Sequence, residues 1–174
     1  MSRILDLAKA IKLLILDVDG VMTDGKLHID DKGVETKTFN SQDGIGIKIL
    51  QNSGVEVAVI TARQSNLVAK RMASLGIQYV YQNQEDKFSI YQMLMEKFSL
   101  SKSQIAMVGD DLPDLKIVHD CGLGIAVANA QAIIKEHADY VTLNSGDNGA
   151  VREICNLIMR AQNTLQAAHD AYLN

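Results

Sequence analysis

The chain has almost none of the residues that interrupt a compact fold. Its 174 residues include one proline and no tryptophan, while 47% are apolar and 22% are charged. This composition excludes a collagen-like or disordered protein and is typical of a globular one. The length suits one complete hydrophobic core and is short for two, so we expect a single domain over residues 1–174.

Cysteine, long apolar runs and basic clusters are also scarce. The two cysteines, Cys121 and Cys155, and the lack of an apolar export segment favour buried thiols in a reducing cytoplasm over a disulfide. The apolar runs are far shorter than the ~20 residues that cross a bilayer, which predicts no membrane span. A net charge of -4 without a basic run argues against a nucleic-acid partner. An anionic substrate must therefore be met by local positive charge.

What the sequence does contain is a buried strand that ends in two aspartates. Leu13–Leu16 is continuously apolar, and Asp17, Val18, Asp19 and Gly20 follow it. Because side chains alternate along a strand, the two carboxylates begin on the same side. Adjacent carboxylates repel each other unless a cation neutralises them, so this pair indicates a cation site.

Further apolar segments alternate with segments of helical pattern. This alternation predicts an α/β fold in three layers, a doubly wound parallel sheet covered by helices on both faces. The expected strands are Leu13–Leu16, Val55–Ile60, 78–81, Ile105–Val108, 122–128 and 140–143. The expected helices are 1–11, Asp43–Asn52, 65–75, one opening at Asp86, one near Pro113, 130–137 and a final one from about Gly149, which together with a tail covers about 149–174. Residues 26–40 carry alternating apolar positions around a turn and predict a β-hairpin inserted after the first strand.

Polar residues follow three of these strands where each one ends. Thr61 and Arg63 follow the second strand, and Asp110 and Asp111 follow the fourth. Ligands of open parallel sheets bind beyond the carboxyl ends of the strands, so these groups should meet Asp17 and Asp19 at one edge. Lys87 lies in the first turn of a helix, where a cation opposes the helix dipole, which suggests a role other than helix stability.

An oxygen-rich cluster of aspartates without histidine or cysteine favours Mg²⁺ over zinc. Asp17 would attack phosphorus and form an aspartyl phosphate, and Asp19 would protonate the leaving oxygen and then activate water. Thr61 and Lys87 would hold the phosphoryl group. Of Asp111 and Asp114, one would hold Lys87 or touch the metal while the other caps the helix at Pro113; we prefer Asp111 beside the metal site.

A signalling receiver domain is the alternative from another class, since it also combines a parallel sheet, acidic residues, a threonine and a lysine. The two aspartates after the first strand, together with GDD at 109–111, supply a proton carrier for turnover, which a phosphate-accepting switch does not need. The sequence therefore favours a hydrolase.

Four ordered segments, DVDGVMTDG, ITAR, Lys87 and GDDLPD, resemble the four motifs of the haloacid dehalogenase superfamily of phosphohydrolases. More closely, these segments and FNSQDGIGIK resemble the 3-deoxy-D-manno-octulosonate 8-phosphate phosphatases of lipopolysaccharide biosynthesis. A phosphatase for another phosphorylated sugar acid, such as sialic acid 9-phosphate, is the alternative within the superfamily.

The resemblance implies roles for individual residues. Asp17 would be the nucleophile, Asp19 the acid and base that also gives a backbone carbonyl to Mg²⁺, and Asp110 a further metal ligand. The residues implied to meet the sugar acid are Asn40, Ser41, Gln42, Asp43, Gly44, Lys48, Arg63 and Arg71, with Lys87 on the phosphoryl group.

The spacing of the motifs leaves no room for a cap domain over the site. Only the hairpin and one helix fit between Asp19 and Thr61, and only a helix and a strand fit between Thr61 and Lys87. We therefore expect neighbouring subunits to cover the site, as in the homotetramers of the resembled family. The final helix carries an apolar stripe, Val151, Ile154, Ile158, Ala161, Leu165, Ala168 and Tyr172, whose first half is expected to pack on the sheet and whose second half is open to either core or subunit contact.

Overall fold

The computed structural model describes residues 2–173, so Met1 and Asn174, the two ends of the expected domain, lie outside it. The helices are α1 Ser2–Lys9, α2 Ser41–Asn52, α3 Asn66–Ser74, α4 Lys87–Phe98, α5 Leu112–Asp120, α6 Ala132–His137, α7 Ala150–Ala161 and α8 Leu165–Asp170, with a short 3₁₀ turn at Lys102–Gln104. The strands are β1 Leu13–Leu16, β2 His28–Ile29, β3 Glu35–Thr36, β4 Glu56–Ile60, β5 Tyr79–Tyr81, β6 Ile105–Gly109, β7 Leu123–Ala126 and β8 Tyr140–Val141.

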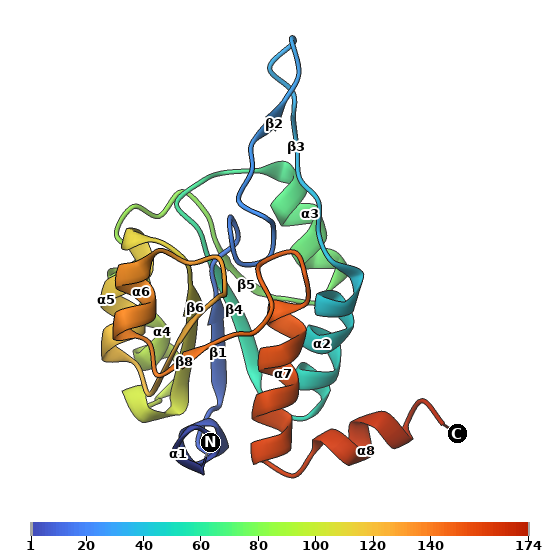
Figure 1. Cartoon of the computed structure of the whole chain (residues 1–174), viewed down its shortest axis with the longest axis vertical. Helices are drawn as coiled ribbons and strands as arrows, with labels where there is room; N and C mark the ends of the chain where they lie inside the picture. Colours follow the sequence, from blue (N-terminus) through green and yellow to red (C-terminus); the bar gives the residue numbers. More distant parts are fainter. Residues whose placement is uncertain (1, 174) are drawn as a thin grey trace.

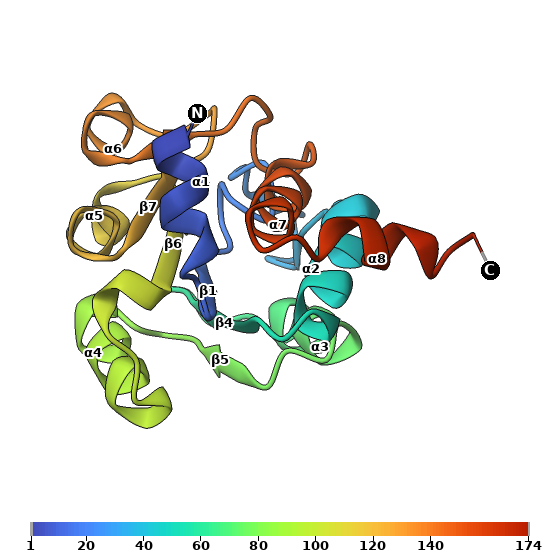
Figure 2. The ribbon, with the colours of Figure 1, turned by 90° about the horizontal axis from the view of Figure 1, so that it is seen from below.

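Six strands form one sheet in the order β5-β4-β1-β6-β7-β8, and every pair in it is parallel. Figures 1 and 2 show α2, α3 and α7 on one face of this sheet and α4, α5 and α6 on the other. The expected three-layer α/β fold is confirmed. In the register of the sheet, Leu16 lies opposite Val59 of β4 and Val108 of β6, so the residues after these strands end at the same edge.

The apolar composition of β1 explains its position at the centre of the sheet. All four of its residues are fully buried, and both neighbouring strands are almost entirely apolar as well. Burying each such side chain contributes about 1.5–3 kcal/mol. Strands covered on both faces can carry no alternation of polar residues, which is why these segments are readable as continuous apolar runs.

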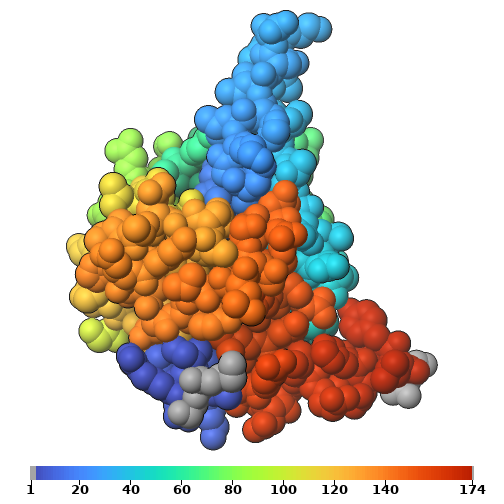
Figure 3. Space-filling model, viewed as in Figure 1, coloured from blue at the N-terminus to red at the C-terminus, as the bar shows by residue number. Residues whose placement is uncertain are grey.

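The hairpin is present, but its paired region is much shorter than expected. Only His28–Ile29 and Glu35–Thr36 pair, in antiparallel register. The turn between them is held by the Asp30 carboxylate, which accepts hydrogen bonds from the amides of Lys32 (2.9 Å) and Val34 (2.8 Å). Figures 1 and 3 show the hairpin standing away from the body of the molecule. With no layer packed over it, the pairing has no burial to extend it.

The C-terminal segment corrects the expectation of one final helix. It forms α7 and α8, separated at residues 162–164, because Asn163 adopts a left-handed conformation with φ +59° and the amide of Thr164 donates to the carbonyl of Met159. Val151, Ile154 and Ile158 are fully buried, which confirms that the first half of the stripe packs into the core. Tyr172 beyond the break is 68% exposed.

Both cysteines are free and buried, as expected, and burial raises the pKa of the Cys121 thiol to about 12. Over residues 2–173, no helix has the length and apolarity needed to span a bilayer.

A buried carboxylate joins the start of α2 to the start of α7. Asp43 is 2% exposed, and its Oδ1 accepts a hydrogen bond from the Arg152 amide at 2.7 Å. Its Oδ2 is buried and has no hydrogen-bond partner among residues 2–173. Burial raises the pKa of Asp43 to about 6, against the opposing effect of the Arg152 amide.

The raised pKa of Asp43 predicts a pH-dependent stability. The folded protein holds this proton more tightly than the unfolded chain, so the stabilisation is complete below pH 4 and is lost as the pH rises through about 6. A shift of about 2 pKa units corresponds to a loss of about 3 kcal/mol. Asp43→Asn keeps the acceptor oxygen and does not ionise. The free energy of unfolding of the variant relative to the wild type should therefore increase by about this amount between pH 4 and pH 8. Urea unfolding at both pH values measures the difference, and a difference that is constant with pH would contradict the prediction.

Candidate active site

Asp17 and Asp19 occupy the position where β1 ends. The amide of Asp17 continues the sheet by donating to the Val108 carbonyl at 3.2 Å, which fixes the residue directly above the strand. Gly20 then turns the chain with φ +96°, and a Cβ at this position would lie 2.1 Å from Oδ2 of Asp110. Glycine is therefore required at position 20 for two reasons: its backbone conformation and the close approach of Asp110.

Lys87 lies between two carboxylates. It is the first residue of α4, after Asp86, whose side chain caps the helix by accepting from the Ser89 amide. Its Nζ lies 2.7 Å from Oδ1 of Asp17 and 2.7 Å from Oδ1 of Asp114, and the side chain is 3% exposed. Burial lowers the pKa of Lys87, but the two carboxylates outweigh it and hold the pKa above its usual value, so the lysine is a fixed cation.

Three carboxylates, those of Asp17, Asp110 and Asp114, converge within 4.8 Å of one another. The amide of Asp110 donates to Asp114 at 3.1 Å, and the strand end allows this approach because a Cβ at Gly109 would lie 2.4 Å from that of Asp114. Burial and then the charge of Asp114 raise the pKa of Asp17 well above its usual value and that of Asp110 to about 7. Oxygen donors alone, crowded and partly buried, fit a hard divalent cation, which would relieve this repulsion.

We expected Asp111 beside the metal site, but Asp114 lies there, with Asp17 and Asp110. Asp111 is exposed and is the N-cap residue of α5, where its Oδ1 accepts from the Leu112 amide at 2.8 Å. Asp114 stands in the first turn of the same helix, is 1% exposed and contacts Lys87. Asp114 is therefore the residue beside the proposed metal site, and Asp111 is the one that caps the helix.

Thr61 lies at the same carboxyl edge of the sheet as Asp17. It follows β4, is 2% exposed, and its Oγ1 accepts from the Arg63 amide at 3.3 Å. A pocket of about 350 Å³ opens above these strand ends, lined by Asp17, Asp19, Gly25, Leu27, Thr61, Ala62, Arg63, Lys87, Asp110, Asp111, Pro113 and Asp114. A larger groove of about 530 Å³ between α2 and α8 contains none of the proposed reacting groups.

The residues expected to meet the sugar acid are not all at this pocket. Arg63 and Lys87 line it, whereas the others of the set within residues 2–173 do not. Asn40 caps α2 by accepting from the Gln42 amide at 2.7 Å, and Asp43 is the buried link to α7. Ser41, Gln42 and Lys48 are exposed on α2, and Gly44 makes room for Arg71, whose Nη2 donates to the Asn40 carbonyl at 3.3 Å.

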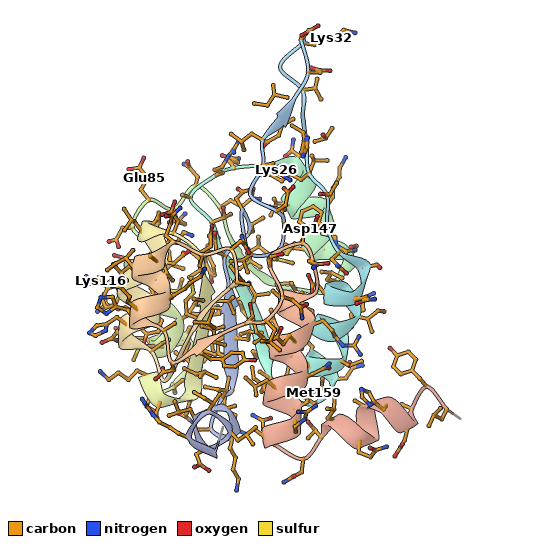
Figure 4. All side chains as sticks on the ribbon, viewed as in Figure 1. Lys26, Lys32, Glu85, Lys116, Asp147 and Met159 are labelled. Atoms are coloured by element: carbon orange, nitrogen blue, oxygen red, sulfur yellow. The ribbon has the colours of Figure 1, made fainter. Side chains whose placement is uncertain are left out.

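Two residues at the site, Lys37 and Glu35, are not among those that the sequence predicts. Lys37, at the base of the hairpin, extends its side chain to Oδ1 of Asp19, and Glu35 joins Lys37 to Arg63. Figure 4 shows where the hairpin begins and ends, with Lys26 labelled near its base and Lys32 at its tip. The only signal in the sequence is that positions 35 and 37 share a face of a strand, since burial of the lysine depends on how the hairpin folds back.

The buried lysine that contacts the aspartate after the central parallel strand lies in a chain that is similar to the haloacid dehalogenase-like hydrolases. The model of this family matches residues 79–154. The 3-deoxy-D-manno-octulosonate 8-phosphate phosphatases of Salmonella typhi and Escherichia coli K12 are 44% and 45% identical, over 96% and 92% of this chain and 89% and 86% of theirs. The chain therefore belongs to the family of 3-deoxy-D-manno-octulosonate 8-phosphate phosphatases.

Solved structures agree with this assignment. The phosphatase of this name from Moraxella catarrhalis, in complex with magnesium, phosphate and the sugar acid, has a TM-score of 0.97 and 43% identity, with 99% of both chains covered. The cobalt-bound Haemophilus influenzae enzyme has a TM-score of 0.91 and 36% identity, over 97% of this chain and 99% of that one. Membership of a hydrolase family decides against the receiver-domain alternative.

Proposed function

We propose that this chain is a Mg²⁺-dependent phosphomonoester hydrolase that releases phosphate from 3-deoxy-D-manno-octulosonate 8-phosphate. The observation that carries the proposal is the buried contact of Lys87 with Asp17 above β1, in a chain of this family. The Moraxella catarrhalis relative holds magnesium, phosphate and the sugar acid together, which supports the same substrate and cofactor here.

In the proposed reaction Asp17 attacks phosphorus, forming an aspartyl phosphate while the bond from phosphorus to the ester oxygen breaks. Asp19 gives its proton to the departing oxygen, so the sugar leaves as an alcohol. Asp19 then takes a proton from water, and the resulting attack on phosphorus releases phosphate and restores Asp17. Thr61 and Lys87 hold the phosphoryl oxygens, and Lys87 also fixes the attacking carboxylate through its 2.7 Å contact.

The metal would be held by Asp17, Asp110 and the backbone carbonyl of Asp19. Bound Mg²⁺ supplies positive charge that lets the anionic nucleophile approach a phosphate dianion. Asp114 then has a separate task, because it already accepts from both Lys87 and the Asp110 amide and thus keeps these two groups in place.

We also propose that the chain acts as one capless domain and that its copies assemble into a homotetramer whose hairpins cover the site. Leu27, Ile29 and Val34 of the hairpin are 54%, 58% and 55% exposed, and Leu27 lines the pocket. Such apolar side chains on a projecting hairpin favour contact with another copy. Light scattering at micromolar concentration tests this, and a monomer mass would contradict it. A cytoplasmic place in lipopolysaccharide biosynthesis completes the proposal, supported by the free thiols.

The function is tested by phosphate release from a panel of 8- and 9-phosphorylated ulosonic acids, with and without Mg²⁺. We expect kcat/KM for the octulosonate 8-phosphate to exceed that for a 9-phosphorylated nonulosonate by about 100-fold or more. The nonulosonate is one carbon longer, so its carboxylate would be displaced and would leave charged groups of the protein unpaired. Chelation of the metal should abolish turnover, and adding Mg²⁺ should restore it. Equal rates across the panel would contradict the substrate, and full activity in chelator would contradict the cofactor.

A further inference from the structure

The hairpin places one charged side chain inside the molecule. Lys37 belongs to a hairpin whose residues are mostly exposed, yet its own side chain is only 2% exposed. Its Nζ forms an ion pair with Oδ1 of Asp19 and lies 3.2 Å from Oε1 of Glu35. The same Glu35 oxygen lies 2.9 Å from Nη2 of Arg63. Asp19, Lys37, Glu35 and Arg63 thus form one chain of charges from the end of β1 to the end of β4.

This arrangement is more than the hairpin needs in order to fold. The turn is held by Asp30, and the base is tied to the body through Thr38 and Asn40, whose side chains donate to the side chain and the carbonyl of Asp147 at 3.3 and 3.1 Å. Burying an ammonium is unfavourable unless it is paired. A lysine at a hairpin base could remain in solvent at no such penalty, so the buried position of Lys37 points to its partner, Asp19.

The contact also leaves Asp19 in a defined orientation. A free carboxylate on a short side chain rotates, whereas one bound through Oδ1 to a buried ammonium presents Oδ2 in a fixed direction. Glu35 holds Lys37 from its other side, and Arg63 holds Glu35. The Glu35 oxygen makes no hydrogen bond within residues 2–173, so charge attraction alone keeps it between the two cations.

We propose that Lys37 is a positioning residue for proton transfer: it orients the Asp19 carboxylate toward the oxygen of the departing alcohol. The inference rests on the proposed function, because it takes from it the role of Asp19. It makes the hairpin part of the chemistry within one subunit, in addition to any role as a cover. The proton itself passes between Asp19 and the leaving oxygen, and Lys37 neither gains nor loses one.

The test uses leaving groups that differ in their need for a proton. Octulosonate 8-phosphate, an alkyl phosphate, must leave with a proton, whereas p-nitrophenyl phosphate releases a stable phenolate without one. Lys37→Met should lower kcat/KM for the alkyl phosphate, which reports the steps up to departure of the alcohol, by about 10- to 100-fold, part of the 10²–10⁴ of general acid catalysis, and change kcat/KM for the aryl phosphate by less than about threefold. Lys37→Arg should restore most of the loss, and Lys9→Met, exposed on α1, is the matched control without effect.

A second comparison asks whether Lys37 acts through Asp19. In the Asp19→Asn background, Lys37→Met should have no further effect on the alkyl phosphate, because the group that it orients is gone. Equal losses of kcat/KM on both leaving groups, a rise in KM without a fall in kcat, or additive losses in the double variant would each overturn the proposal. If the wild type does not hydrolyse the octulosonate phosphate, the proposed function fails separately. The comparison of any hydrolysed alkyl phosphate with the aryl phosphate still decides the role of Lys37.

Discussion

Replacing Asp17 by asparagine is expected to abolish turnover, lowering kcat by at least about 10⁴-fold, because the amide keeps the shape of the side chain but is not a nucleophile. The fold should survive. Burial and the Asp114 charge raise the pKa of Asp17, so its ionised form is unfavourable in the folded protein, and removing that charge relieves the repulsion. Without metal, the Asp17→Asn variant should therefore unfold at a temperature no lower than the wild type.

The two measurements together separate chemistry from folding. Phosphate release with the octulosonate substrate gives kcat, and thermal unfolding in chelator gives the stability. Asp6→Asn, exposed on α1, is the matched control and should keep full activity. An Asp17→Asn variant that keeps more than a tenth of the wild-type rate would contradict the assignment of the nucleophile.

Replacing Lys87 by methionine is expected to impair both stability and activity. The variant leaves the buried carboxylates of Asp17 and Asp114 without their shared cation, and breaking such a buried pair costs about 3–5 kcal/mol. The loss should be largest at pH 8 and smaller at pH 5, because protonation of Asp17, whose pKa is already raised, removes part of the uncompensated charge. Urea unfolding in chelator at the two pH values measures it.

A double-mutant cycle with Asp114→Asn isolates the Lys87 contact. In the Asp114→Asn background, Lys87→Met should cost about 2 kcal/mol less than in the wild type, since one of the two stranded carboxylates is absent. The control is Lys102→Met, which removes a surface pair with Asp120 at 3.4 Å and should change stability by less than about 0.5 kcal/mol. Additive losses in the cycle would show that Lys87 and Asp114 do not interact in solution.

The parts of the structure that the sequence predicts are those fixed by the sheet. Continuous apolar runs identify the strands, and parallel strands bring their carboxyl ends to one edge, so the sequence alone places Asp17, Thr61 and Asp110 together. Their convergence depends only on strand order and direction. This is also why the three-layer fold was predictable.

The parts of the structure that the sequence did not predict depend on the exact residue at which a helix begins or ends and on tertiary contacts. Asp111 and Asp114 lie three residues apart at a helix start, and only the position of the N-cap decides which one points back at Lys87. The break between α7 and α8 depends on one left-handed residue, Asn163, within an apolar stripe of continuous spacing. The burial of Lys37 depends on the path of the hairpin, which no periodicity encodes.

The hairpin leaves the site and returns to it within residues 25–37, and only four of its residues pair as strands. It is therefore a module attached at both ends to the reaction centre and independent of the sheet that builds that centre. Exchange of residues 27–34 between relatives would leave Lys87 and the carboxylates of Asp17, Asp110 and Asp114 untouched. Such an exchange would change the pocket lining at Leu27, while the residues proposed to carry out the hydrolysis stay constant.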